Sequence, residues 1–113
     1  MACSGDMLLQ ALVGCAGVTL RSVATNRGLD VSGMVRAEGD LDFRGTLAVD
    51  RDAPVGFEAI RLRFELDSDA DEEQLSSLLK LTERYCVVLQ SLARSPQLSA
   101  ELRSGLVTVA SAP

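Results

Sequence analysis

With 113 residues and a formal net charge of −5, the chain is long enough for one modest hydrophobic core, and we expect a single domain over residues 1–113. The acidic balance argues against nucleic acid and anionic membrane surfaces as partners, because both require clustered Lys and Arg. The chain has no histidine, which excludes a Cys-His protease and a mixed Cys/His zinc site. We expect neither a metal nor a cofactor.

An apolar stretch from Met7 to Leu20 predicts a long buried helix. Asp6 comes just before it and is interpreted as the N-cap, where a carboxylate accepts hydrogen bonds from first-turn amides. The apolar spacing continues to Ala24, and Gly28 then suits the C′ position beyond the helix end.

The same stretch has an alternative interpretation, because Leu12–Cys15 resembles the box at which bacterial lipoproteins are cleaved and acylated on cysteine. A signal peptide also needs a basic segment first, and the charge that precedes the stretch is that of Asp6. The stretch is also shorter than the roughly 20 residues that span a bilayer. A buried core helix is preferred, and no membrane partner is expected.

Loosely alternating apolar residues from Val31 to Phe43 predict an irregular strand with bulges at Gly33 and Gly39. Arg44-Gly45 is interpreted as a turn, and Thr46–Val49 as a short second strand.

The clearest strand pattern runs from Phe57 to Leu66, where apolar and charged residues alternate. The alternation predicts one face toward the core and one toward water, with Arg61 and Arg63 on the solvated face.

Acidic residues over Asp67–Asp71 end this strand and cap a second helix, which ends near Tyr85. Cys86 follows, and Val87–Ala93 predicts another short helix. A final strand is expected over Leu102–Val109.

The three cysteines are an odd number without tight spacing, which is untypical of a disulfide framework and indicates a reducing cytoplasm. Cys3 lies near the terminus and is interpreted as incidental. Cys15 lies mid-helix, where free cysteine is ordinarily a small buried hydrophobe. Cys86 precedes a helix and has Arg84 nearby, so local reasoning favours Cys86 as the thiol with the lower pKa.

Two motifs occur in order along the chain. The first is an acidic residue, a Leu-rich helix and a small residue before cysteine, here Asp6 to Cys15. The second resembles a helix that ends in Cys-Pro-Val, here Tyr85-Cys86-Val87-Val88. With the glycine-containing strands and Gly56–Ile60 between them, the chain resembles the OsmC/Ohr family of thiol-dependent peroxide reductases, especially its OsmC-like branch, from about Ser4 to Ala110.

The resemblance implies an α+β fold in which a central cysteine-bearing helix packs against antiparallel sheet, as an intertwined homodimer with active sites between subunits. It implies that Cys15 is the peroxidatic cysteine and Cys86 the resolving cysteine of a stress-response peroxidase for organic hydroperoxides or hydrogen peroxide. Cys15 would become a sulfenic acid, Cys86 would trap it as a disulfide, and a thiol reductant would restore both.

Asp6 matches a family glutamate, which implies an active-site carboxylate as the alternative to an N-cap. Along one helix Asp6 lies about 13 Å from Cys15, so a catalytic role would act on a partner subunit's site, and capping is the favoured interpretation.

The chain departs from the family pattern at three places. We expect it to lack the N-terminal segment that carries a thiolate-stabilising arginine, Val87 replaces proline, and Asp6 replaces glutamate. Without the arginine, the pKa of Cys15 should stay near or above its reference of about 8.5, because burial disfavours the thiolate. The alternative function is a non-catalytic OsmC-like dimer with a binding or structural role, and a lipoprotein anchored at Cys15 is a distant third.

Overall fold

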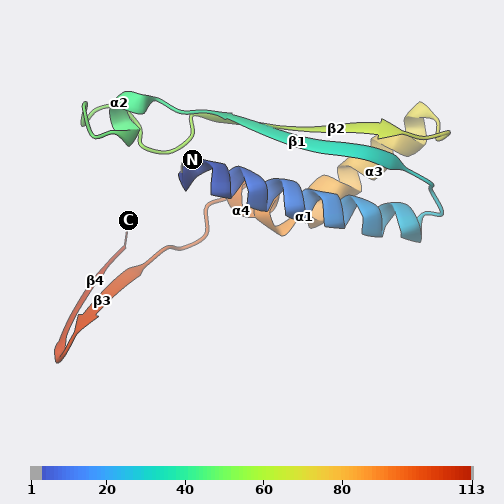
Figure 1. Ribbon diagram of the computed structural model, residues 1–113. Coiled ribbons are helices and arrows are strands. Elements are labelled where there is room, and N and C mark those ends of the chain that lie inside the picture. The colour runs from blue at the N-terminus through green and yellow to red at the C-terminus, as the bar shows by residue number, and fades with distance from the viewer. Residues whose placement is uncertain (1–3, 113) are drawn as a thin grey trace.

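The computed structural model describes residues 4–112, which form four helices and four strands. In chain order these are α1 (Ser4–Asn26), β1 (Ser32–Asp40), α2 (Phe43–Thr46), β2 (Ala59–Asp67), α3 (Glu72–Tyr85), α4 (Val87–Ala93), β3 (Ala100–Ser104) and β4 (Val107–Ser111). Antiparallel β1 and β2 form one layer, and α1, α3 and α4 lie on one face of it (Figure 1). The hairpin of β3 and β4 projects away from this body.

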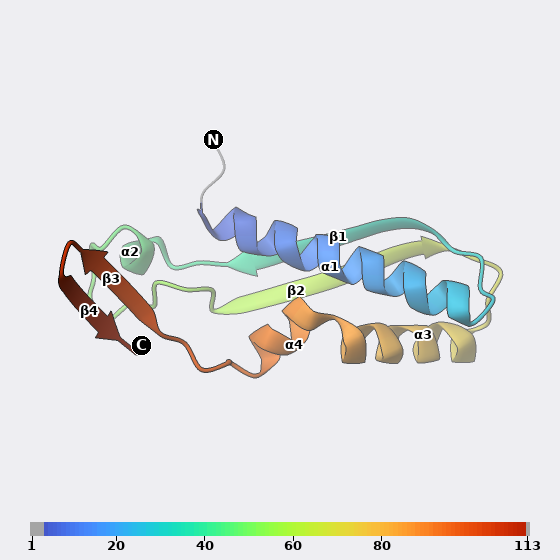
Figure 2. The ribbon, with the colours of Figure 1, turned by 90° about the horizontal axis from the view of Figure 1, so that it is seen from below.

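The core follows one stripe of α1. Every fourth residue along the helix is buried, namely Leu12, Ala16, Leu20 and Ala24. This stripe packs against the inward face of β2 and against buried Leu78 of α3. Figure 2, seen from the helical side, shows α1 running along the sheet beside the line of α3 and α4. The predicted alternation of β2 is confirmed, since its apolar residues lie inward.

The first helix begins earlier than the sequence predicted. Within the described residues α1 starts at Ser4, so Asp6 lies in its first turn instead of at the N-cap. There its carboxylate still meets the positive end of the helix dipole. The expected end is confirmed, because Gly28 follows the helix with a φ of 70°, a conformation that glycine adopts without steric cost.

α1 is also apolar enough, by length and composition, to cross a membrane. Its 23 residues exceed the apolar stretch from Met7 to Leu20, because the helix continues through polar residues to Asn26. The core helix of a soluble protein and a signal sequence satisfy the same criterion. In this fold α1 uses its buried stripe to hold the sheet and the other helices.

The predicted bulges at Gly33 and Gly39 are wrong. β1 pairs with β2 residue for residue along its whole length. The glycines instead permit close approach: a Cβ at Gly33 would lie 2.0 Å from the carbonyl oxygen of Glu65, and one at Gly39 would lie 2.5 Å from the Phe57 ring. Gly33 also has a φ of 144°, which L side chains rarely adopt.

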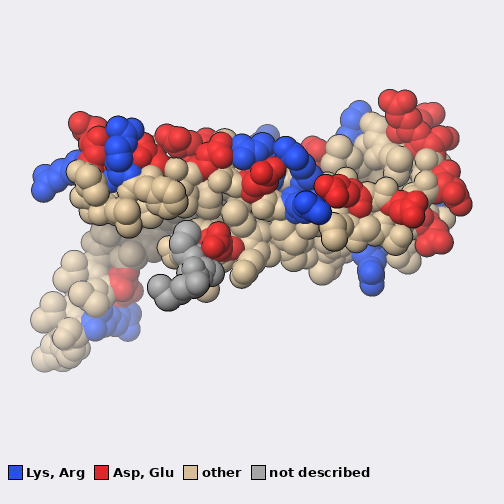
Figure 3. Space-filling model, turned by 45° about the horizontal axis from the view of Figure 1, so that its top comes forward, with Lys and Arg blue, Asp and Glu red and all other residues tan. Residues whose placement is uncertain are grey.

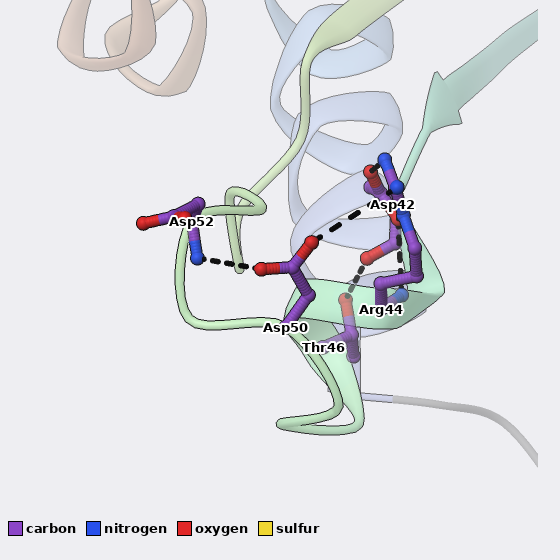
Figure 4. A network of polar contacts seen from close by, with 5 residues as sticks. All are labelled: Asp42, Arg44, Thr46, Asp50 and Asp52. Atoms are coloured by element: carbon purple, nitrogen blue, oxygen red, sulfur yellow. Dashed lines mark hydrogen bonds and ion pairs between the residues drawn. The ribbon is translucent and has the colours of Figure 1, made fainter.

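The turn at Arg44-Gly45 and the strand over Thr46–Val49 are also wrong, because this segment forms α2 and a compact loop. Asp42 caps the helix by accepting the Arg44 backbone N–H at 3.0 Å, and the Arg44 side chain bonds the same carboxylate. Asp50 lies on the other side of Arg44 and accepts the Asp52 N–H (Figure 4). Side-chain capping has overridden a weak strand pattern.

Downstream, the two helices are confirmed and the last strand is corrected. Asp71 and Gln74 form a capping box at the start of α3, and α4 spans the predicted residues. The single strand expected over Leu102–Val109 is a hairpin, because Gly105, with a φ of 59°, opens a tight turn in its middle.

We predict that Gly45→Ala lowers the free energy of unfolding by about 1–3 kcal/mol, the usual cost of overpacking. A Cβ at this position would lie 2.1 Å from the Pro54 carbonyl oxygen, and backbone cannot move aside as a side chain can. The control is Gly56→Ala, since a Cβ there meets nothing within 4 Å. Denaturant midpoints decide the point, and equal midpoints for both variants would contradict it.

Candidate functional site

The candidate site is built around a break between α3 and α4. Cys86 is both the C-cap of α3 and the N-cap of α4, with extended backbone angles of φ −78° and ψ 106°. Its N–H donates to the Thr82 carbonyl oxygen at 3.0 Å, and its own carbonyl accepts the Gln90 N–H at 3.0 Å. The break therefore keeps its backbone bonds while it turns the chain, and the Cys86 side chain is fully buried.

Cys15 reaches this break from the middle of α1. It is half-buried and packs against the cluster formed by Leu12, Ala16 and Cys86. α4 lies beside α1 (Figure 1), and its residues Val88 and Leu89 pack against the same cluster.

The two cysteines belong to one packed cluster. Cys15 packs against the cluster that contains Cys86, each cysteine shifts the pKa of the other, and both are free of disulfide bonds. The fold thus brings together residues that are 71 positions apart in the chain and that the resemblance pairs. Packing into one cluster is the proximity that a disulfide between two cysteines requires.

Hydrogen bonds lower the pKa of Cys15 below its ordinary value. The main cause is the Val88 backbone N–H, which donates to the sulfur and favours the thiolate. Burial acts in the opposite direction, while the Cys86 thiol, the Val87 N–H and the Thr19 hydroxyl add further donation. The expectation that Cys15 would keep a pKa near or above its reference is therefore wrong, because neutral donors act where no cation was predicted.

Burial raises the pKa of Cys86, and the neighbouring Cys15 raises it further against donation from the Leu89 N–H. Local reasoning had favoured Cys86 as the more acidic thiol, and this is also wrong. Donation from the start of α4 outweighs burial for Cys15, which packs there from α1, but does not outweigh burial for Cys86. Arg84, the nearby cation, instead lies 5.5 Å from the centroid of the Tyr85 ring.

The remaining predicted residues lie elsewhere. Asp6 is exposed at the start of α1, more than two turns from Cys15 in the same continuous helix, so the structure does not bring it to the thiols within one chain. Cys3 lies outside the described residues. Arg61 and Arg63 lie on the outer face of the sheet, as predicted, where they pair with Glu38 and Asp40 in a band of mixed charge (Figure 3).

Sequence reasoning missed the donors around Cys15. Thr19 lies one turn from Cys15 on α1, so its hydroxyl was recognisable from the sequence as a nearby donor. The Val87 and Val88 amides belong to a correctly predicted helix whose position beside α1 the sequence does not reveal. Among the described residues, no group of three or more His, Cys, Asp or Glu side chains could hold a metal ion.

Comparisons with known proteins give a family and a fold. The family described as OsmC-like protein matches residues 2–101. The crystal structure of an OsmC-like protein from Mycoplasma pneumoniae has a TM-score of 0.68 and 18% sequence identity to this chain. The match covers 79% of this chain and 60% of that chain, so the likeness confirms the predicted α+β OsmC-like fold. No curated protein sequence matches at a significant level.

We predict that Cys15 is alkylated at lower pH than Cys86. Only the thiolate reacts, so a lowered pKa moves the rise in rate to lower pH, and a raised pKa moves it to higher pH. Iodoacetamide labelling across a pH series, followed by peptide mass analysis, measures each cysteine separately. The measurement is made on the folded chain. Labelling of Cys86 at a lower pH than Cys15 would contradict the assignment.

Proposed function

We propose, on the premise that this chain belongs to the OsmC-like protein family, that it is a thiol-dependent peroxide reductase in which Cys15 attacks and Cys86 resolves. The observation that carries the proposal is that Cys15 packs against the cluster that contains the buried Cys86, where the pKa of Cys15 is lowered. A nucleophilic thiolate beside a second thiol is the arrangement that such chemistry requires.

In the first step the Cys15 thiolate attacks the nearer oxygen of an organic hydroperoxide or of hydrogen peroxide. A sulfur–oxygen bond forms and the oxygen–oxygen bond breaks. The leaving alkoxide or hydroxide takes a proton to become an alcohol or water, and Cys15 is oxidised by two electrons to a sulfenic acid. Donors already directed at the sulfur keep a larger thiolate fraction at neutral pH.

In the second step the Cys86 sulfur attacks the sulfenic sulfur. A disulfide forms, and the sulfenic oxygen leaves as water with the proton that Cys86 releases. The raised pKa of Cys86 keeps this thiol protonated until Cys15 is oxidised, so the two cysteines do not compete for peroxide.

In the third step an external thiol reductant supplies two electrons and returns both cysteines to the reduced state. A reducing cytoplasm, which we propose as the location, provides such thiols. The peroxide and the reductant are then small-molecule and thiol partners, and the cycle uses no metal or cofactor.

We predict that peroxide converts the reduced chain to a Cys15–Cys86 disulfide while one equivalent of peroxide is consumed. The rate should rise with pH through the lowered pKa of Cys15 and level off above it, because only the thiolate attacks. Cys15→Ser should reduce consumption to the uncatalysed level, and Cys86→Ser should leave Cys15 open to sulfinic and sulfonic oxidation. Non-reducing peptide mass analysis measures all three.

Cys3→Ser is the matched control and should behave as the parent chain. If peroxide is not consumed at any pH, the peroxidase proposal fails, and the non-catalytic relative becomes the better account.

We further propose that the chain acts as a homodimer. Its radius of gyration is 18.3 Å, against about 13–14 Å for a compact domain of this length. The hairpin of β3 and β4 is exposed along its whole length, although a two-stranded hairpin alone is marginally stable in water. Both features support an assembly in which a second copy covers exposed parts of this chain.

The hairpin has two unlike faces. Leu102 pairs with Val109 and shares a face with Val107, whereas Arg103 pairs with Thr108 on the opposite face. The three apolar side chains are more than half exposed. An unpartnered apolar face of this kind is typical of an interface.

We predict that the chain sediments as a dimer at micromolar concentration and that Leu102→Glu shifts it toward monomer, because the added charge lies on the apolar face. Thr108→Glu adds the same charge to the polar face and should leave the dimer intact. Analytical ultracentrifugation of the three proteins decides the matter, and a parent chain that is monomeric would contradict the proposal.

A further inference from the structure

The break between α3 and α4 also lines a depression in the surface of the protein. The depression has a volume of about 410 Å³, and two arginines, Arg84 and Arg94, are among its lining residues. Cys86 lines it as well and belongs at the same time to the buried cluster with which Cys15 packs. Because the Cys86 side chain is fully buried and both arginines are exposed, the cysteine lies at the floor and the arginines at the rim.

Contacts across the break hold the walls of this depression. The Gln90 Nε2 donates to the Glu83 carbonyl oxygen at 2.7 Å, which ties α4 to the last turn of α3. The Arg94 N–H donates to the Gln90 carbonyl oxygen at 3.0 Å and so closes α4. The Arg84 guanidinium lies over the Tyr85 ring, 5.5 Å from its centroid. Stacking uses the flat face of a guanidinium and leaves its N–H groups available for an acceptor.

The depression is locally cationic in an acidic protein. The chain has a net charge of −5, yet residues 84–100 contain two arginines and no Asp or Glu. In the part of the chain that the structure describes, no carboxylate pairs with Arg84 or Arg94, whereas the arginines of β1 and β2 are each paired. The fork of a guanidinium matches the two oxygens of a carboxylate. A carboxylate from outside the chain is therefore the group that this rim fits.

We propose that the depression binds the thiol reductant of the cycle described above, and that this reductant carries a carboxylate which Arg84 and Arg94 hold beside Cys86. The inference rests on the proposed function. It adds to that function a binding site and a chemical class for the reductant.

The chemistry of disulfide exchange favours a reductant site on the Cys86 side. The reductant thiolate bonds to the Cys86 sulfur, the Cys15–Cys86 bond breaks, and Cys15 leaves with the electron pair as a thiolate. A second reductant thiolate then attacks the mixed disulfide, so that two reductant thiols become one disulfide and Cys86 leaves and takes up a proton. The thiol of lower pKa leaves faster, and the pKa is lowered for Cys15 and raised for Cys86.

The attack also needs access to a buried sulfur. The Cys86 side chain is fully buried in the reduced chain, so the break must open locally before the reductant reaches it. The break is suited to local opening, because a single residue joins the two helices there and α4 has no buried residues.

The test compares two thiols of different charge. Diamide converts the two cysteines to the disulfide, so that the experiment does not depend on peroxide. The disulfide is then reduced at low ionic strength with mercaptosuccinate, which carries carboxylates, or with neutral 2-mercaptoethanol, and peptide mass analysis measures the rates. Comparing the ratio of the two rates between parent and variant cancels the intrinsic reactivity of each thiol.

We expect Arg84→Gln/Arg94→Gln to lower the ratio of the mercaptosuccinate rate to the 2-mercaptoethanol rate about fivefold, the size expected for two exposed ion pairs. Added salt should lower the ratio of the parent chain in the same direction. The matched control is Arg27→Gln/Arg51→Gln, which removes the same charge from two exposed arginines outside the depression. This control should keep the ratio of the parent chain.

Two results would overturn the inference: an unchanged ratio in Arg84→Gln/Arg94→Gln, or an equal fall in the control, which would indicate a general effect of net charge. If diamide forms no disulfide, titration of the reduced chain with succinate decides. The Arg84 and Arg94 Nε–H resonances should then shift to saturation, and their failure to shift would also overturn the site. Peroxide consumption is measured separately, so a charge-selective reduction without peroxide consumption would refute the proposed function while supporting the depression as a carboxylate site.

Discussion

The packing of the break between α3 and α4 against the middle of α1, which gathers Cys86 and Cys15 into one cluster, is the contact on which the candidate site depends. Burial in the middle of an apolar helix raises the pKa of a cysteine, because it disfavours the charged thiolate. The break at Cys86 starts a second helix beside α1, and donation from the Val88 backbone N–H of that helix lowers the pKa of Cys15. The same break buries Cys86 and raises its pKa. One local change of direction therefore makes two similar thiols chemically different.

The charged side chains and the two thiols lie on different sides of the sheet. The outer face of the sheet carries Arg and acidic side chains that pair with one another in water (Figure 3), where ion pairs contribute little to stability. The thiol site faces the other side, among apolar residues and neutral donors. Hydrogen bonds in such surroundings are less screened than surface charges, so a few amides can favour a thiolate.

The chain has two parts, of which one has a buried core and the other does not. The layer formed by β1, β2 and the helices has a buried stripe and positions the thiols. The hairpin of β3 and β4 has no such core, and its apolar face is exposed. A family relative of known structure is longer than this chain, which matches 60% of it. We propose that a second copy covers the hairpin, which would place the assembly and the thiol chemistry on different surfaces of one fold.

The sequence by itself determined the elements that local patterns encode. The 3.6-residue period of α1, the alternation along β2 and the capping residues at Asp71 were all readable, and the two motifs indicated the family. Local pattern could not place the glycines, because Gly33, Gly39 and Gly45 respond to atoms distant in the chain. Nor could it rank the two thiols. The acidity of Cys15 depends on amides from a helix that only tertiary packing brings to it, and hydrogen bonds act over a few ångströms regardless of sequence separation.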